Sequence, residues 1–200
     1  MDFRILYQVF FRPGMVFKEF MDKQRLEPLI FVGILSIIAS LTAYVGHFED
    51  VINKPWLIII GLLQSALALL AFPVLSTIFV FWAAHSVLRI KIAFITLLSV
   101  FVLCELPYYI EAALTILTGY SPISVGSLFG PFGDRPTLLF AFLLTITPFF
   151  VWTVVLWWMA IRQLFKLPRQ QTMIVVGPLV LLNLFAGGIW NSFATKLTGM

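Results

Sequence analysis

Apolar residues form five long stretches along the chain, and polar residues are concentrated in the short segments between them. The stretches cover residues 28–48, 56–88, 92–117, 137–164 and 171–193. An α-helix needs about 20 apolar residues to cross about 30 Å of hydrocarbon, and each stretch supplies that number. The pattern therefore predicts an all-α integral membrane bundle of five transmembrane helices. Residues 28–200 form this membrane domain, and residues 1–27 form a cytoplasmic N-terminal segment.

The N-terminal segment contains an amphipathic pattern that begins after Arg12. Pro13 suits the first turn of a helix. Val16, Phe17 and Phe20 fall on the same helical face as Pro13, and charged residues fall on the opposite face. The pattern favours a short helix that lies in the membrane interface. Packing of this face against the rest of the chain, or against a partner protein, would explain the same pattern.

Three of the stretches carry a proline near their middle, namely Pro73, Pro107 and Pro148. Proline has no backbone N–H, so each of these residues is expected to kink its helix and to free a carbonyl group. The Gly- and Pro-rich loop over residues 119–136 is expected to rest on the outer leaflet. A partner-binding or re-entrant loop is the alternative for this segment.

Composition and charge agree with a membrane protein and add its orientation. The chain has 61% hydrophobic and 11% charged residues, whereas a soluble domain has about 25% charged residues. Ten of the 13 Lys and Arg residues lie before the first stretch, between the second and third, or at the end of the fourth and just after it. This bias predicts a cytoplasmic N-terminus and an external C-terminus. Trp157 and Trp158 are expected near the inner interface.

The net charge of +4 is attributed to orientation and to contact with anionic lipid headgroups. The chain has no basic run with interleaved aromatic residues, so nucleic acid is not expected as a partner.

Glu105 is the polar residue that points most strongly to a function. It lies halfway through the third stretch, where a charge costs about 2.5–3.5 kcal/mol. Tyr109 shares its helical face, and Glu111 lies nearer the outer interface, where it is expected to reach water. The other polar candidates within the stretches are Ser36, Ser40, Ser76, Thr77, Thr145, Thr147 and Asn183. Either these residues form hydrogen bonds between helices, or Glu105 is a proton or substrate site.

No catalytic or metal site is predicted. His47 and His85 are expected at opposite membrane faces, and the single cysteine, Cys104, cannot form an intrachain disulfide. Glycine-rich phosphate loops, G-x-S-x-G and H-E-x-x-H patterns are all missing from the sequence. We therefore expect no enzyme activity, no cofactor and no metal.

Four short patterns carry a resemblance to a known family. They are Arg12-Pro13 with Phe17 and a later Pro28; Arg89-Ile90-Lys91 followed by Ile92-Ala93-Phe94; Leu106-Pro107-Tyr108; and Val151-Trp152 through Ala160-Ile161-Arg162. In this arrangement the chain resembles prokaryotic members of the Yip-domain family, within the Ypt/Rab-interacting-protein superfamily. The resemblance implies a small five-span membrane protein without catalytic residues, located in a prokaryotic cytoplasmic membrane.

The function expected from these features is non-enzymatic. The resemblance implies an accessory, scaffold or assembly factor for partner membrane proteins, in trafficking or in an export complex, in contact with membrane lipids. The alternative is a transporter or channel for a small molecule, ion or lipid, with an interior site near Glu105. The oligomeric state is not predicted.

Overall fold

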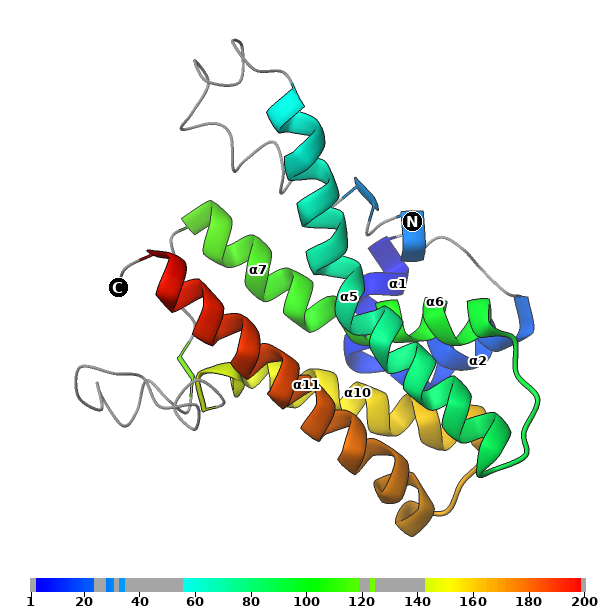
Figure 1. Ribbon diagram of the computed structural model, residues 1–200. Helices are drawn as coiled ribbons and strands as arrows, with labels where there is room; N and C mark the ends of the chain where they lie inside the picture. Colours follow the sequence, from blue (N-terminus) through cyan, green and yellow to red (C-terminus); the bar gives the residue numbers. More distant parts are fainter. Residues whose placement is uncertain are drawn as a thin grey trace.

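The computed structural model describes residues 3–23, 28–30, 33–34, 56–118, 123–124 and 143–198. Within these ranges the regular secondary structure is helical and contains no strand. The main helices are α1 (Phe3–Phe11), α2 (Pro13–Lys23), α5 (Trp56–Ser86), α6 (Phe94–Cys104), α7 (Leu106–Thr118), α10 (Pro148–Phe165) and α11 (Arg169–Thr198) (Figure 1). Most of the predicted first stretch, residues 28–48, and most of the 119–136 loop lie outside the described residues.

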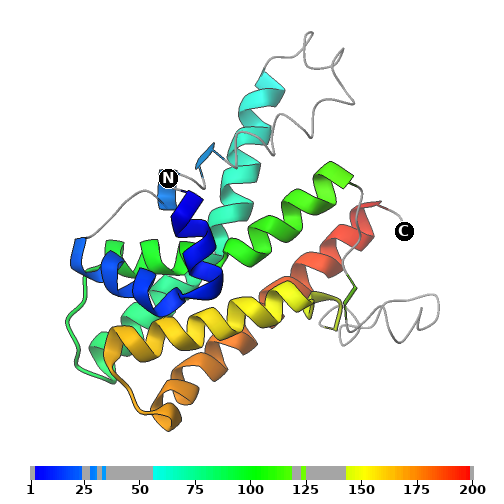
Figure 2. The same ribbon diagram turned by 180° about the vertical axis from the view of Figure 1, so that it is seen from behind.

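Helix α10 lies at the centre of the bundle. It contacts α2, α6, α7 and α11, and α5 contacts α6 and α11. The two short N-terminal helices pack on the side of the bundle formed by α6 and α10, as the reverse view shows (Figure 2). The core therefore forms where α2, α6 and α10 meet.

The third predicted stretch is divided into two helices. The helix α6 ends at Cys104, and α7 begins at Leu106 and continues in a different direction (Figure 1). Pro107 explains the break because it has no N–H to donate to the carbonyl of Leu103. The kink expected at Pro107 is therefore a break, and residues 92–117 contain two helices joined at Glu105.

The fourth predicted stretch is also interrupted. Thr147 is extended, with φ −108° and ψ 166°, and Pro148 is in the first turn of α10. The residue before a proline is driven out of the helical region, while proline itself suits a helix start. Pro148 therefore begins a helix in the structure, and the expectation that it would kink one is wrong.

The second and fifth stretches form the two longest helices. The 31-residue helix α5 contains Pro73 in its interior and ends within two residues of the predicted boundary. The 30-residue helix α11 contains Pro178 and extends beyond the predicted range of 171–193 at both ends.

The N-terminal segment contains one more helix than expected, because α1 precedes α2. Val16 and Phe17, on the apolar face of α2, are buried where this helix contacts α6 and α10. Packing against the rest of the chain therefore describes this face, and the placement of the helix in the membrane interface stays a prediction. Phe20 lies in α2, but its side chain is outside the described part of the structure.

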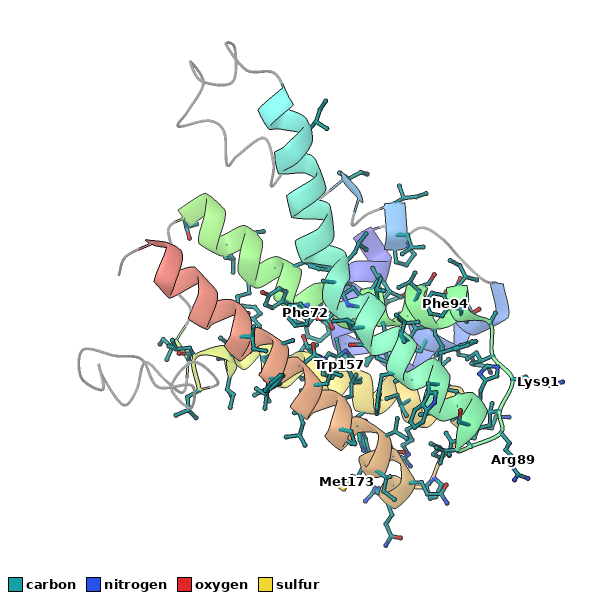
Figure 3. The ribbon with its side chains drawn as sticks, in the orientation of Figure 1. Phe72, Arg89, Lys91, Phe94, Trp157 and Met173 are labelled. Atoms are coloured by element: carbon teal, nitrogen blue, oxygen red, sulfur yellow. The ribbon has the colours of Figure 1, made fainter. Side chains whose placement is uncertain are left out.

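Trp157 lies in the middle of the core (Figure 3). Its side chain is 1% exposed, and its ring meets that of Phe150 edge to face at 6.4 Å between centroids. Trp157 therefore packs inside the protein, and its position near the inner interface stays a prediction. Its neighbour Trp158 is only partly buried, and the Arg162 guanidinium lies 5.3 Å from its ring centroid.

Two helical segments in the described ranges are long and apolar enough to cross a membrane, Pro148–Phe165 and Arg169–Ile189. Shorter apolar helical segments cover Leu70–Ser86 and Phe94–Cys104. The number of five crossings remains a prediction from the sequence.

Candidate functional site

Glu105 occupies the junction between α6 and α7. Its backbone N–H donates to the carbonyl oxygen of Phe101 at 3.1 Å, and its own carbonyl oxygen accepts from the N–H of Tyr109 at 3.0 Å. The backbone is thus helical on both sides of the bend, and the side chain is held at the place where the direction changes. It is 4% exposed, so the carboxyl group is enclosed by protein.

The surroundings of this carboxyl group are polar but incompletely paired. Oε1 of Glu105 has no hydrogen-bond partner among the described residues, and the same holds for Nε1 of Trp157 and Oγ1 of Thr153. The Trp157 indole lies beside the carboxyl group without completing a hydrogen bond of normal geometry. Thr153 precedes Trp157 by one helical turn, so both project from the same face of α10.

Glu111 has a hydrogen-bond partner on the neighbouring helix α10. The hydroxyl group of Thr147 donates to Oε2 of Glu111 at 3.1 Å and accepts from the N–H of Phe150 at 3.1 Å. The same hydroxyl group therefore caps α10 and links it to α7. Glu111 is 6% exposed, so the expectation that it would reach water is corrected.

Asn183 joins α11 to α5. Its Nδ2 donates to Oγ of Ser76 at 3.3 Å and to the carbonyl oxygen of Leu179 at 3.1 Å. Next to Ser76, the hydroxyl group of Thr77 donates to the carbonyl oxygen of Pro73 at 2.6 Å. The polar residues within these apolar helices are thus bonded to backbone or to one another.

The candidate residues predicted from the sequence therefore lie at separate sites in the structure. Thr147 and Glu111 are brought together, Asn183 meets Ser76, and Tyr109 is buried in the core one turn after Glu105. The role of Trp157 beside Glu105 was missed because its spacing along α10 carries no signal of that contact.

The residues predicted to form the N-terminal amphipathic helix make up a second candidate site. Pro13 is buried, Phe17 is in the core, and Arg12 is exposed. Nε2 of Gln163 donates to the carbonyl oxygen of Gly14, which fastens the corner between α1 and α2 to α10. An open pocket of about 580 Å³ lies at this corner.

Basic side chains gather at the end of the bundle where α5 and α10 end and α11 begins. Arg89 and Lys91 project from the α5–α6 loop at this end (Figure 3). Arg162, Lys166 and Arg169 lie at the adjoining helix ends and are exposed. These residues come from separate segments of the chain, so the charge bias seen along the sequence corresponds to one end of the described structure.

The described sites offer few groups that could bind a metal or a ligand. Among the described residues, no group of three or more His, Cys, Asp or Glu side chains is arranged to hold a metal ion. The two described pockets lie at the N-terminal corner and on the outer side of α11, away from Glu105. The buried hydrogen bonds between the described helices serve helix packing.

Comparison with known proteins agrees with the expected family. The family model of the Yip1 domain matches residues 7–190. No curated protein and no solved structure gives a significant match. The matched range includes α2, the Glu105 junction, the Thr147–Glu111 contact and the Asn183–Ser76 contact. The chain therefore belongs to the Yip1-domain family of membrane proteins.

Proposed function

We propose that this protein is a non-enzymatic accessory or scaffold protein that binds other membrane proteins, in trafficking or in an export complex. The observation that supports this proposal is the use of the buried polar groups. Thr147 with Glu111, and Asn183 with Ser76, tie helices together within a packed interior. Interhelical hydrogen bonds of this kind hold a rigid surface for a partner and need no internal ligand.

The outer side of α11 is the surface that we assign to the partner. Met173, Ile174, Leu181 and Phe185 are exposed along this helix. Leu181 and Phe185 also line a shallow groove of about 540 Å³ with Leu182 and Leu184. A transmembrane helix of a partner would fit an apolar groove of this kind by close packing.

Photo-crosslinking in native membranes tests this assignment. A benzophenone amino acid replaces Leu181 in the groove, and the matched control carries it at Trp82, an exposed position on α5. We expect Leu181 to give one discrete adduct with a single membrane protein and Trp82 to give none. The same diffuse set of adducts from both positions, or only lipid adducts from Leu181, would refute the assignment.

The accompanying topology is part of this proposal. Five crossings, with a membrane domain over residues 28–200 and residues 1–27 on the cytoplasmic side, would place the basic end of the bundle in the cytoplasm. The gathering of Arg89, Lys91, Arg162, Lys166 and Arg169 at one end supports this orientation.

A transport function near Glu105 is the second candidate, and one observation favours it. The Glu105 carboxyl group and the Trp157 indole are buried side by side, and each retains an unpaired polar atom among the described residues. Groups of this kind can bind a proton, an ion or a small polar molecule that crosses the membrane.

Measuring proton or solute flux into vesicles reconstituted with the protein tests the role of Glu105. If it acts in transport, Glu105→Gln lowers proton or solute flux by about tenfold or more, because the amide does not ionise. Glu111→Gln is the control, since Glu111 is already paired with Thr147. Equal flux in the wild type and the Glu105→Gln variant would remove this residue from any transport mechanism.

A further inference from the structure

The corner between α1 and α2 is held rigidly against the end of α10. Val9 of α1 and Phe17 of α2 are fully buried, which anchors both helices to the core. Gln163 donates to the carbonyl oxygen of Gly14 across this contact. A Cβ atom at Gly14 would lie 3.1 Å from Oε1 of Gln163, so the glycine allows the close approach. The corner is therefore a fixed part of the bundle.

The opposite side of the same corner is apolar and exposed. Tyr7 is 63% exposed, Phe11 69% and Met15 52%. The rings of Tyr7 and Phe11 lie with their centroids 4.6 Å apart, which makes one continuous aromatic surface. Exposing three large, neighbouring apolar side chains to water is unfavourable, so this surface is expected to contact lipid or protein.

The pocket at this corner combines apolar walls with positive charge. Phe11, Met15 and Met159 supply apolar walls, while Arg12 and Lys18 supply two cations. No carboxylate is among the described residues that line it. The ligand that complements this lining has an anionic group next to an apolar body.

The position of the pocket further restricts which kind of ligand it can bind. Gln163 also lines it and precedes Lys166, at the end of α10, by three residues. The pocket therefore lies at the basic end of the bundle, at the level where α10 stops. In a membrane this is the level of the headgroups, where phosphate groups and the first carbons of acyl chains meet.

We propose that this corner binds one anionic phospholipid. Arg12 and Lys18 contact the phosphate, and Arg12 can do so through two parallel N–H groups. Phe11, Met15 and Tyr7 contact the glycerol and the upper acyl chains. The lipid covers the exposed apolar surface and holds the N-terminal helices at the membrane surface. This binding is separate from the partner surface on α11.

Lipid binding by the purified full-length protein tests the proposal. Native mass spectrometry from detergent measures the occupancy of phosphatidylglycerol against phosphatidylcholine. We expect the wild-type protein to retain one phosphatidylglycerol. The double variant Arg12→Gln with Lys18→Gln is expected to weaken this binding by roughly tenfold to thirtyfold, because the two lost cations contribute comparable shares of the affinity for an anionic lipid.

The control is the double variant Arg89→Gln with Arg169→Gln, which removes the same charge from exposed positions outside the pocket. It should leave the affinity within about twofold. Equal weakening in both double variants would show general electrostatic attraction and overturn the specific site. Unchanged binding in the pocket variant would overturn it as well.

A second variant keeps the charges and changes the apolar walls. Phe11→Ser with Met15→Ser retains Arg12 and Lys18, and we expect it to lose the single retained lipid because the acyl contacts are gone. Thermal unfolding confirms that each variant is folded. Crosslinking of a protein, and not a lipid, from position 15 in native membranes would refute the proposal.

Discussion

Glu105 and Glu111 lie six residues apart, and the structure gives them different surroundings. Glu111 accepts a hydrogen bond from Thr147, whereas Oε1 of Glu105 has no partner among the described residues. A buried polar group without a partner costs about 1–3 kcal/mol. A buried group that lacks such a partner is a stronger candidate for binding than one that already accepts a hydrogen bond. At the scale of single residues, Glu105 is therefore the better functional candidate and Glu111 the better structural one.

Thr147→Val tests the structural role of the Glu111 contact. The substitution removes both the bond to Glu111 and the cap on the Phe150 N–H, and we expect it to destabilise the protein by about 2 kcal/mol. The measurement is thermal unfolding of the detergent-solubilised protein. Thr147→Ser retains the hydroxyl group and should restore most of the loss.

The control for this prediction is Thr153→Val on the same helix. The Thr153 side chain is also buried, but its hydroxyl group has no partner in the described structure. Removing that hydroxyl group is expected to change the stability by less than about 0.5 kcal/mol, or to raise it. Similar losses for the two Val variants would contradict the assigned roles.

At the scale of the elements, α10 and α11 show how backbone geometry positions these residues. Thr147 and Pro148 start α10, and Lys166 ends it in the left-handed conformation with φ 51° and ψ 36°. Pro168 follows and separates α10 from α11, whose buried glycine, Gly187, lies against Thr145. The turn and the close approach together set the position of α11 beside α10.

Lys166→Gly is expected to stabilise the end of α10. A residue with a side chain pays about 1–2 kcal/mol in the left-handed region, and glycine does not. We expect a gain of about 1 kcal/mol in the free energy of unfolding. Lys166→Ala removes the same charge but keeps the Cβ atom, so it should show no gain. A gain in both variants would assign the effect to charge.

Gly187→Ala is expected to disturb the contact between α11 and the segment before α10. The added Cβ atom would lie 2.6 Å from Cγ2 of Thr145, which real packing does not allow. We expect a loss of about 1–3 kcal/mol, measured by thermal unfolding. Thr145→Ser removes the clashing methyl group and should recover part of this loss.

Gly177→Ala is the matched control within the same helix. A Cβ atom at Gly177 meets nothing within 4 Å, so the stability should be unchanged or slightly higher. If the two glycine variants behaved alike, the close approach at Gly187 would not be important for packing.

For the whole molecule, the distribution of charge is the property that relates the bundle to a membrane. Arg89 and Lys91 mark one end, and α7 and α11 end at the opposite side of the structure (Figure 1, Figure 3). The N-terminal corner, with Arg12 and Lys18, belongs to the basic end through its bond to α10. Such a distribution orients a membrane protein and attracts anionic lipid to one leaflet.

Cysteine labelling in intact cells tests this orientation. The native Cys104 is buried, so the wild-type chain is expected to be unreactive with a membrane-impermeant thiol reagent. We expect Thr118→Cys, at the exposed end of α7, to react in intact cells. Arg89→Cys should react only after the membrane is opened. Labelling of Arg89→Cys from outside would reverse the proposed topology.

The sequence by itself determined the helical class, the membrane character and the family. These properties are local or additive: hydropathy is summed over some 20 residues, and Pro or Gly acts on its own turn. The same local rules could have placed the helix start at Pro148, since Thr147-Pro148 is a sequence signal for a cap. The end of the second stretch was predicted to within two residues of Ser86 for the same reason.

Only the tertiary structure decided which polar groups meet and which faces are covered. Thr147 and Glu111 are 36 residues apart in the chain, and Asn183 and Ser76 are 107 apart. Trp157 entered the core and α2 turned its apolar face inward, whereas α1 left the side chains of Tyr7 and Phe11 outside. Lipid and a protein interior are equally favourable surroundings for an apolar side chain, so hydropathy cannot distinguish between them. Packing between helices makes that choice, and it depends on the shape of the whole bundle.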